Sequence, residues 1–579
     1  MQSPTNRREF LQRAAAATVF AGLSGRASFA SVPPKELSAD IVIVGGGVGG
    51  CAAALAALRN GCSVILTEET DWIGGQFTSQ GVSAPDEHGS IESFGRTAAY
   101  ASFRESIRAF YRDNFPLTAE ARRQQCLNPG GGWVSVLCHE PNVALAVFNS
   151  LLLPYSSTSQ LTLLLETSPI AADMKKDRVN SVMVRSLDGH QTALHGRYFL
   201  DATELGSLLP LTKTAYVTGT EAQSETHELH APTIADPNAV QAIASCFALD
   251  YRPGEDHTID KPDQYAFWRD YVPQLTPAWP GKLLSLDASS PYKNEVRPFI
   301  LEPTLDVAFP ARFIQAKDGR KVEDLWTYRR IRNRHNFAGG SNSITLVNWP
   351  QNDYWLGRID EVPADEAAKH IKASKQLGLS LLYWIQTEAP HEDGKTGWPG
   401  VRFRPDVMGT VDGFAKTPYV RESRRIRALF TITEEHVGFQ QRQQMAGPHA
   451  ENLQAANFPD SVGIGSYRLD THPTVTGINY VDLSSLPHEI PLGALIPEKT
   501  INLIAAAKNI GTTHLSNACY REHPIEWNIG ESAGCLAAFC LRSSSIPRQV
   551  REDKKLLADF QQSLASQGIE LHWPSIKEV

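Results

Sequence analysis

The sequence predicts an α/β fold in which both ends of the chain build one parallel sheet and a mixed α+β region is inserted between them. Two observations near the amino end predict it. A short run of β-branched residues enters a glycine-rich turn, and a helix of small residues follows at once. The third observation lies near the carboxyl end, where another strand, turn and small-residue helix complete the pattern.

The composition of the 579 residues is that of a globular protein, with 42% hydrophobic and 20% charged residues. A disordered or collagen-like chain is disfavoured. The formal net charge of −8 gives no general attraction to nucleic acid or anionic membranes, so neither is expected as a partner. The eight cysteines include no CxxC pair, which removes the usual support for zinc-ribbon and thioredoxin sites and leaves isolated disulfides open.

The first thirty residues have the features of an export signal. Residues 6–12 resemble the twin-arginine signature, and the apolar stretch 14–23 is shorter than the ~20 residues that span a membrane. Small residues at both ends of 28–30 indicate a cleavage site. We expect a signal peptide over 1–30, the twin-arginine export machinery as a partner, no transmembrane anchor, and a periplasmic or secreted product. The alternative is the basic amphipathic start of a cytosolic protein.

A strand, a glycine turn, a helix and a second strand are predicted in order over the next segment. The β-branched run 40–44 predicts a buried strand, the turn 45–50 has the pattern G-x-G-x-x-G, and the small-residue run 51–59 predicts a helix. Residues 63–67 predict the next strand. A glycine fingerprint in this context is typical of a dinucleotide site.

Each position of this fingerprint has an expected task. Gly45 permits the tight turn, Gly47 lets the backbone approach the pyrophosphate, and Gly50 allows close helix packing. The helix start then holds phosphate by its free amide groups and its dipole. Glu68 follows the second strand and can accept hydrogen bonds from both ribose hydroxyls, which disfavours NADP at this site.

Further segments resemble the FAD-dependent oxidoreductases that are related to fumarate reductase and glutathione reductase. The Gly74-Gly75 pair in segment 71–81 resembles the extended segment that lies along the pyrophosphate and passes the isoalloxazine ring. Segment 198–206 resembles the strand and Ala-Thr-x-x-Gly turn that return to the FAD domain. Segment 501–511 resembles the last strand. The helix expected over 528–541 resembles one that points its amino end at the flavin pyrimidine.

The resemblance covers both ends of the chain and implies a Rossmann-like fold with FAD as the cofactor. Segments 79–82, 86–88 and 421–426 look like a large bacterial branch whose members are mostly named only as FAD-dependent oxidoreductases, some of them labelled xanthan lyases. The residues that the resemblance places at FAD are Gly45, Gly47, Gly49, Gly50, Glu68, Gly74, Gly75, Gln76, Ser79, Ala202, Thr203, Gly206, Asn528, Ile529 and Gly530. The alternative for the small residues of the last helix is tight helix packing.

The rest of the chain sets the expected domain division. A helix is expected over 143–152, a strand over 161–165, and a strand pair over 179–194 that turns at Asp188-Gly189. No second nucleotide fingerprint follows. The expected parts are the signal peptide over 1–30, a first FAD-binding part over 39–210, a substrate or cap domain over 211–490, the returning FAD-binding strand and helix over 491–545, and a helical tail over 546–579.

The candidate catalytic residues lie between the last strand and the last helix. A flavin accepts hydride at N5, so the protein must bind the substrate and manage one proton. Histidine suits that task near neutral pH, which makes His514 and His523 candidates; either could instead bond FAD or fix the loop. Arg521 could fix a substrate carboxylate or the charge of the reduced flavin, or it could brace Glu522 or Glu526.

Several polar segments are candidates for the substrate region. The arginines of 328–335 and 421–425 either read an anion or form ion pairs with nearby acids. Tyr467, His472 and the stretch 348–353 either line a sugar-sized pocket or pack in a core. No metal site is assigned, because spacing alone does not show that acidic and histidine side chains converge.

The expected function is that of an exported FAD-dependent oxidoreductase. It would transfer hydride between a small organic substrate, such as an alcohol or sugar-like group, and flavin N5, with oxygen or a periplasmic electron carrier as the acceptor. One alternative is a reductase of an activated alkene that is fed by a periplasmic carrier. The other is a lyase or carbohydrate-binding protein in which the flavin is structural.

Overall fold

The computed structural model describes residues 35–290, 295–447 and 452–574. From Glu36 onward the chain forms one compact unit. The predicted signal peptide over 1–30 lies outside the described residues. Within the described ranges, no helix combines the length and the apolar character that crossing a lipid bilayer requires.

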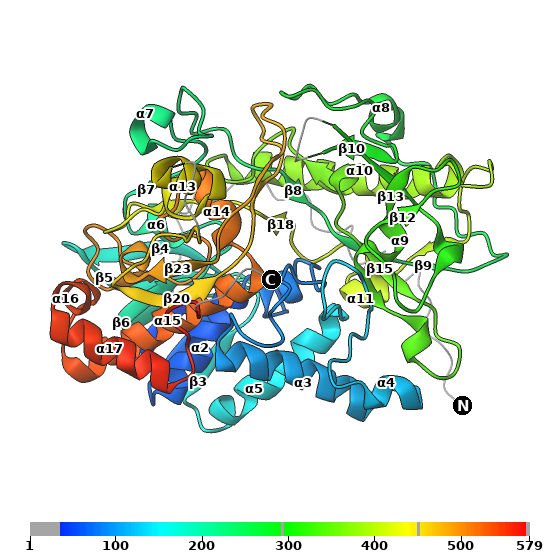
Figure 1. The fold of residues 1–579 in the computed structure, drawn as a ribbon. Coiled ribbons are helices and arrows are strands. Elements are labelled where there is room, and N and C mark those ends of the chain that lie inside the picture. The colour runs from blue at the N-terminus through cyan, green and yellow to red at the C-terminus, as the bar shows by residue number, and fades with distance from the viewer. Residues whose placement is uncertain (1–34, 291–294, 448–451, 575–579) are drawn as a thin grey trace, which may run out of the picture. The chain divides into compact units, whose positions relative to one another are not determined.

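A seven-stranded sheet joins the start of the chain to its end (Figure 1). The strand order is β3-β2-β1-β6-β5-β4, and β24 pairs with β6. The bounds are β1 (Lys35–Val44), β2 (Val64–Thr67), β3 (Leu161–Leu164), β4 (Thr167–Lys175), β5 (Arg178–Ser186), β6 (Gln191–Asp201) and β24 (Leu503–Ala505). The β1–β2, β2–β3 and β6–β24 pairs are parallel. The predicted mixed α/β fold with a parallel sheet is therefore present.

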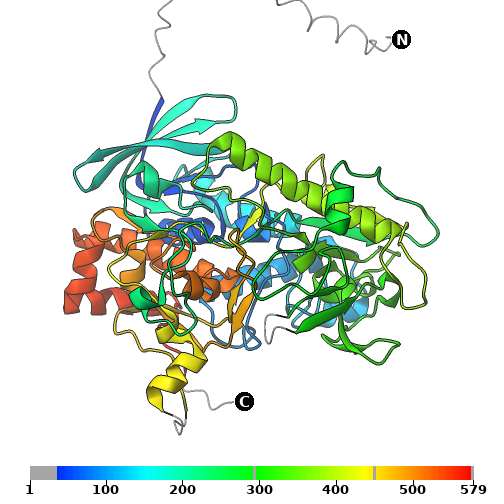
Figure 2. The ribbon, with the colours of Figure 1, turned by 90° about the horizontal axis from the view of Figure 1, so that it is seen from above.

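The local elements expected in the first 200 residues are confirmed. The helix expected over 143–152 lies within α5 (Pro141–Ser157), and β3 matches the strand expected over 161–165. The expected strand pair is the antiparallel pair β5–β6. With β4 these strands form an antiparallel meander, which is drawn in cyan-green at the upper left of Figure 2.

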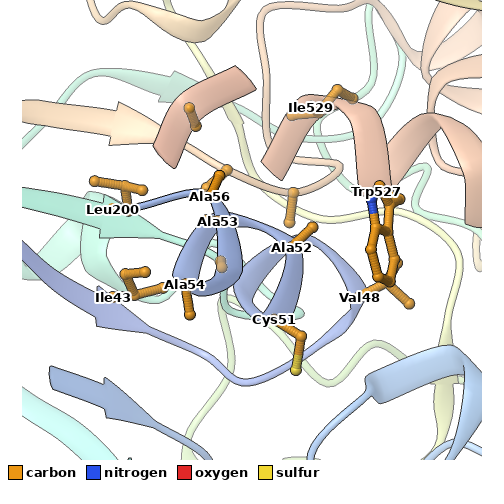
Figure 3. Close-up of a cluster of buried hydrophobic side chains, with 14 of the residues drawn as sticks. Ile43, Val48, Cys51, Ala52, Ala53, Ala54, Ala56, Leu200, Trp527 and Ile529 are labelled. Carbon is orange, nitrogen blue, oxygen red and sulfur yellow. The ribbon is translucent and has the colours of Figure 1, made fainter. Parts of the chain in front are cut away.

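Helix α15 (His523–Ser543) crosses α2 (Val48–Arg59) at close range because both helices carry small residues at the crossing. A side-chain carbon on Gly530 would lie 2.0 Å from the Gly49 carbonyl oxygen, and one on Gly534 would lie 2.3 Å from that of Ala53. Figure 3 shows Trp527 of α15 beside Val48 at the start of α2. Small residues allow backbones to approach where larger side chains would be overpacked. Helix packing thus explains Gly530 and Gly534.

The expected start of this helix at Asn528 is wrong. The helix begins at His523, with Glu522 in the N-cap position and Pro524 in the first turn. Proline fits there because its missing amide hydrogen is not needed by the first turn. Asn528 therefore lies inside the helix rather than at its amino end.

Residues 211–490 form smaller sheets and one long helix, α10 (Ala364–Thr387), which crosses the upper part of Figure 2. One sheet has the order β14-β15-β9-β17 and another β16-β8-β18. Their bounds are β8 (Ile243–Ala244), β9 (Phe247–Tyr251), β14 (Arg330–Arg332), β15 (Ile344–Val347), β16 (Asp353–Tyr354), β17 (Val401–Phe403) and β18 (Tyr419–Val420). A second hydrophobic core, rich in tryptophan and tyrosine, fills this region.

The remaining elements complete the frame around these sheets. A third four-stranded sheet has the order β10-β11-β13-β12, and the pairs β20–β23 and β21–β22 lie later in the chain. Their bounds are β10 (Asp287–Ser289), β11 (Val296–Ile300), β12 (Ile314–Gln315), β13 (Lys321–Asp324), β20 (Ser461–Gly465), β21 (Leu469–Thr471), β22 (Val481–Leu483) and β23 (His488–Pro491). Helices α3 (Ala98–Asn114), α16 (Pro547–Glu552) and α17 (Lys554–Ser566) contact α15.

Candidate active site

One cavity lies at the carboxyl ends of β1, β2 and β6, and we call it the dinucleotide cavity. Its lining residues are Val44, Gly45, Gly47, Thr67, Glu68, Glu69, Ser79, Pro169, Ala202, Thr203, Glu204, Leu205, Ile359, Ile371, Thr417, Pro418 and Val420. The ends of parallel strands are where α/β sheets bind nucleotides. The structure thus brings six predicted cofactor residues together: Gly45, Gly47, Glu68, Ser79, Ala202 and Thr203.

The carboxyl group of Glu68 is fixed at the end of β2 by three hydrogen bonds. Its Oε2 accepts from the Gly46 amide at 3.0 Å, and its Oε1 accepts from the Thr70 amide at 3.0 Å and the Thr70 hydroxyl at 2.8 Å. Burial raises the pKa of Glu68 to about 8. The carboxyl group is therefore held in one place beside the glycine turn, where a ribose hydroxyl can meet it.

The Gly74-Gly75 pair packs directly on the glycine turn. The Gly74 amide donates to the Gly46 carbonyl at 2.7 Å, and a side-chain carbon on Gly75 would lie 2.8 Å from the Gly47 Cα. Gly74 and Gly75 also have positive φ angles of 107° and 51°, which glycine adopts readily. Two glycines are needed here because two backbones meet where a phosphate must approach.

The segment after this pair contains buried polar groups without protein partners. In the described part of the chain, Gln76 Oε1, both amide atoms of Gln80, Ser83 Oγ and Glu526 Oε1 make no hydrogen bond. Buried polar atoms are normally satisfied, so such a group indicates a ligand or an ordered water. Gln76 Nε2 donates to the Arg521 carbonyl at 2.9 Å, which joins this segment to the start of α15. These unpaired polar atoms fit the donors and acceptors of an isoalloxazine ring.

The predicted residues Gly49, Gly50, Asn528, Ile529 and Gly530 have packing contacts instead. Side-chain carbons on Gly49 and Gly50 would lie 2.0 Å from the Ala506 carbonyl oxygen and 1.9 Å from that of Gly45. The side chain of Asn528 accepts from the Ile464 amide at 3.1 Å. Gly206, the last residue of the Ala-Thr-x-x-Gly turn, has a positive φ of 61°. Their direct contact with FAD stays a prediction.

A second cavity is lined mainly by charged and aromatic side chains, and we call it the polar cavity. Its lining residues are Asp86, Glu87, Trp133, Val134, Ser289, Arg297, Arg312, Tyr328, Arg329, Asn348, Trp349, Pro350, Tyr419, Arg421, Tyr467, Arg468, Asp470, His472, Tyr480, Asp482, Arg521 and Glu522. Six of these are arginines and five are acids. The sequence suggested Tyr467, His472 and the stretch 348–353 as pocket-lining residues. Tyr467, His472 and residues 348–350 line the polar cavity, whereas residues 351–353 do not.

The two cavities share the extended segment 417–421. Pro418 and Val420 line the dinucleotide cavity, whereas Tyr419 and Arg421 line the polar cavity. Alternate side chains of a strand point to opposite faces, and Tyr419 and Val420 form β18. This short segment therefore presents apolar groups to the dinucleotide cavity and polar groups to the polar cavity.

Arg521 is the one predicted catalytic residue that lines the polar cavity. Its Nη1 donates to the Tyr419 hydroxyl at 2.7 Å and lies 2.9 Å from Glu522 Oε1, and its Nη2 donates to the Asp470 carbonyl at 3.0 Å. Burial raises the pKa of Glu522 to about 8. The raised pKa of Glu522 means that this carboxyl group compensates the Arg521 charge less completely near neutral pH than a fully ionised one would.

His514 and His523 do not line either cavity. Nδ1 of His523 accepts from the Asp86 amide at 3.3 Å, so its Nε2 carries the proton and donates to the Val82 carbonyl at 2.9 Å. Burial lowers the pKa of His523 to about 4. Nδ1 of His514 lies 3.0 Å from Glu422 Oε2. Both histidines bond to neighbouring chain segments, as expected of residues that fix the loop. A catalytic role for either of them stays a prediction.

The arginine clusters form ion pairs. Arg329 pairs with Asp86 at 3.2 Å, Arg332 with Glu140 at 2.6 Å, and Arg421 with Asp353 at 2.7 Å. The ion-pair alternative is therefore confirmed for these arginines. Arg329 and Arg421 also line the polar cavity, so the same side chains can meet a ligand.

Two further outcomes concern cysteine and metal. All eight cysteines are free, so no disulfide is formed. Ligand-type atoms of Asp86, Glu522 and His523 lie within 4.8 Å of one another. However, both ring nitrogens of His523 bond to the backbone and Asp86 pairs with Arg329. The protein's own contacts thus already use most of the ligand atoms of this group.

Sequence reasoning missed one constellation in the polar cavity. Asp353 Oδ2 lies 2.6 Å from His472 Nδ1 and accepts from the Tyr480 hydroxyl at 2.7 Å, while Asp353 Oδ1 pairs with Arg421. Asp353 belongs to β16, and Arg421 directly follows β18. His472 directly follows β21, and Tyr480 directly precedes β22. The four residues therefore come from separate parts of the sequence. No spacing signal joins them. Only the tertiary fold brings this histidine and this aspartate together.

The glycine turn after β1, the acidic end of β2 and the returning β24 and α15 define a flavoprotein of the dinucleotide-binding class. The chain belongs to the FAD-dependent oxidoreductase family, whose model matches residues 40–564. FAD is therefore its cofactor, and the chain is an oxidoreductase. When bound, FAD supplies a two-electron acceptor that takes hydride.

The solved structures similar to this chain share little sequence with it. No curated protein matches the chain. L-proline dehydrogenase from P. horikoshii is 17% identical over 34% of this chain and 26% of its own, with a TM-score of 0.17. A geranylgeranyl bacteriochlorophyll reductase-like protein from Thermoplasma acidophilum is 9% identical over 92% and 85%, with a TM-score of 0.29.

Adenylylsulfate reductase from the hyperthermophilic Archaeoglobus fulgidus is 15% identical over 31% of this chain and 32% of its own, with a TM-score of 0.21. The chain thus spans only about a quarter to a third of the proline dehydrogenase and of this reductase. Similarity at this level does not transfer a substrate.

Proposed function

We propose that this protein transfers hydride between an organic substrate in the polar cavity and N5 of FAD in the dinucleotide cavity. The observation that carries the proposal is segment 417–421, in which Thr417, Pro418 and Val420 line the dinucleotide cavity and Tyr419 and Arg421 line the polar cavity. A flavin whose nucleotide part lies against Pro418 and Val420 would bring its ring close to the residues of the other face. The unpaired amide of Gln80 and hydroxyl of Ser83 support a ring in this place.

The chain's own residues would bind and orient the substrate. Arg521 is a buried cation held by Tyr419 and by the Asp470 carbonyl, so it offers fixed charge at the cavity. Fixed charge in a buried site stabilises an anionic group without reorganisation. We assign Arg521 to substrate binding, with an alcohol or sugar-like group as the hydride donor.

The location and the acceptor are part of the same proposal. Residues 6–12 and 28–30 support twin-arginine export to the periplasm or outside, and oxygen or a periplasmic electron carrier would reoxidise the flavin. Residues 39–210 and 491–545 would act as the FAD-binding part, and 211–490 as an inserted substrate domain. The tail over 546–579 would brace the FAD-binding part.

The test is an anaerobic screen of FAD-loaded protein against alcohols, sugars and carboxylates. A hydride donor bleaches the oxidised flavin, and the spectrum returns when oxygen or an electron carrier is added. A purified protein that binds no flavin, or a flavin that no compound bleaches, would contradict the proposal.

Arg521 also supports a second candidate function. A buried guanidinium beside the substrate could donate a proton during reduction of an activated alkene. Comparing dye-coupled reduction of alkenes with dye-coupled oxidation of alcohols on the same preparation separates the two directions.

A further inference from the structure

The polar cavity contains a histidine whose two ring nitrogens have different surroundings. Nδ1 of His472 lies 2.6 Å from Asp353 Oδ2, whereas Nε2 makes no hydrogen bond in the described chain. Asp470 Oδ2 lies 3.9 Å from Nε2, which is beyond hydrogen-bond distance. His472 lines the cavity, and Asp353 does not.

Asp353 is well suited to fix the tautomer of this histidine. Its side chain is fully buried and accepts from the Tyr480 hydroxyl at 2.7 Å as well as from His472. Burial alone would raise the pKa of Asp353, but Arg421 and His472 together hold it below its usual value. An ionised Asp353 requires the proton of neutral His472 to lie on Nδ1. The lone pair is then on Nε2.

The charges around His472 favour its neutral form. Burial and then Arg421 lower its pKa, against the opposing effects of Asp353 and Asp470. Tyr480, whose ring centroid lies 4.9 Å away, completes the surrounding groups. A neutral histidine with a fixed tautomer and a free Nε2 can accept a proton. When it does, the adjacent Asp353 carboxylate stabilises the imidazolium.

The same cavity offers positive charge for an anion. Arg421, on the far side of Asp353, and Arg521, beside Tyr419, both line it, and the Nε atoms of both are buried without a hydrogen-bond partner in the described chain. Arg421 is paired with the ionised Asp353, whereas the raised pKa of Glu522 leaves the Arg521 charge less fully compensated. Of these two arginines, Arg521 therefore offers the more positive charge to a substrate carboxylate.

We propose that the polar cavity takes a hydroxy acid, that Arg521 binds its carboxylate, and that Nε2 of His472 removes the proton of its hydroxyl group. The inference rests on the proposed hydride transfer. The C–H bond breaks and its electron pair leaves with the hydrogen to FAD. The O–H bond breaks and its proton goes to Nε2, and the C–O bond becomes a carbonyl, so that an oxo acid is the product. Asp353 is a positioning residue that acts through His472.

The experiment uses FAD-loaded protein without oxygen. Glycolate and lactate are compared with ethylene glycol and propane-1,2-diol, which carry the hydroxyl group but not the carboxylate. The hydroxy acids are expected to bleach the flavin at least tenfold faster than the diols. Equal rates would overturn the proposed substrate class and leave the hydride transfer standing. If no compound of this panel or of the wider screen bleaches the flavin, the proposed function and the inference both fail.

His472→Gln tests the proton transfer, and His370→Asn is the matched control. His370 is a partly exposed histidine with Nδ1 2.8 Å from the Tyr354 hydroxyl, outside both cavities. His472→Gln should lower the rate of flavin reduction by about 10²–10⁴-fold at unchanged flavin content, whereas His370→Asn should not change it. The wild-type rate should fall as pH falls through the pKa of His472, and the variant should lose this dependence. Unchanged kinetics in His472→Gln would overturn the assignment.

A binding measurement keeps the two roles separate. Acetate has a carboxylate but no hydroxyl group, so its affinity, measured by calorimetry, should drop at least tenfold in Arg521→Met and persist in His472→Gln. Asp353→Asn should lower the reduction rate while acetate still binds. Equal affinity of acetate for wild type and Arg521→Met would show that Arg521 does not bind the substrate carboxylate.

Discussion

The dinucleotide cavity and the polar cavity lie on opposite faces of segment 417–421, but they are lined by different kinds of residue. The first is formed largely by backbone, glycine and small side chains at the ends of strands. The second is lined mainly by charged and aromatic side chains, some of which form ion pairs with each other. A cofactor common to a whole family needs an approachable backbone. A particular substrate needs placed charges, so under the proposed function the polar cavity would carry the specificity.

The largest expected effect is on the charges of the polar cavity. Arg421→Met leaves Asp353 buried without its ion-pair partner, since both side chains are at most 2% exposed. Removing one partner of a buried pair costs about 3–5 kcal/mol. Urea unfolding should show this loss. Lys369→Met breaks an exposed pair with Asp365 and should cost less than about 1 kcal/mol. Equal effects would show that the polar cavity is not held together by its buried charges.

Glu522→Gln should change the pH dependence of stability. In the native protein burial raises the pKa of Glu522 to about 8, against an ordinary value of 4.5. Between these values the native state keeps a proton that the unfolded state releases, so wild-type stability falls as pH rises. One group contributes up to about 1.4 kcal/mol per pH unit in this window.

The variant should therefore show a flatter profile of unfolding free energy between pH 6 and pH 8. Asp86 and Asp470, which raise the pKa of Glu522, and Arg521 and Arg329, which lower it, stay unchanged. Glu435→Gln, a partly exposed carboxylate on α12 (Glu434–Val437), serves as the control. If the unfolding free energies of wild type and Glu522→Gln change with pH in parallel, Glu522 must be ionised beside Arg521 at neutral pH.

Gly530→Ala tests the close crossing of α15 and α2 in the region of the dinucleotide cavity. The added methyl group would lie 2.0 Å from the Gly49 carbonyl oxygen, so α15 must move away from α2. Overpacking of this kind costs about 1–3 kcal/mol, and flavin content should fall because the glycine turn shifts with α2. Gly89→Ala is the control, because its methyl group would meet no atom within 4 Å. Full flavin content in Gly530→Ala would contradict the dependence of FAD binding on this crossing.

Glu68→Gln should have the smallest effect of the set. Replacing the carboxyl group at the end of β2 by an amide should weaken FAD binding about tenfold, or ~1.4 kcal/mol, since the amide keeps only one of the two acceptor oxygens that meet Gly46, Thr70 and a ribose hydroxyl. Flavin fluorescence during titration of the apoprotein measures the dissociation constant. Asp188→Asn, on the exposed turn of the meander, should leave it unchanged. An equal affinity for FAD in wild type and Glu68→Gln would show that Glu68 does not bind the ribose.

The sequence predicted the dinucleotide region better than the polar cavity for a physical reason. Gly45, Gly47 and Glu68 lie in one strand–helix–strand unit, and local chain geometry alone brings them together. The start of α15 was misplaced because the small residues after Asn528 are a packing signal, whereas its helix start is set by Pro524 and the N-cap Glu522.

The polar cavity could not be predicted in the same way. His472 and Asp353 meet through the packing of separate small sheets, and no local pattern records that contact. The sequence did suggest His472 and Tyr467 as pocket residues, and the arginine clusters as ion-pair partners. It did not show which acid each of them would find. Charges at long separation depend on the whole fold.

The polar cavity and a bound flavin should adjoin across segment 417–421. Titration of FAD-loaded protein with acetate, followed by the visible flavin spectrum, tests it most directly. Acetate bound at Arg521 should shift the flavin absorption band in wild type, and the shift should be lost in Arg521→Met. Acetate that binds by calorimetry without any change in the flavin spectrum would show that the two cavities are not parts of one active site.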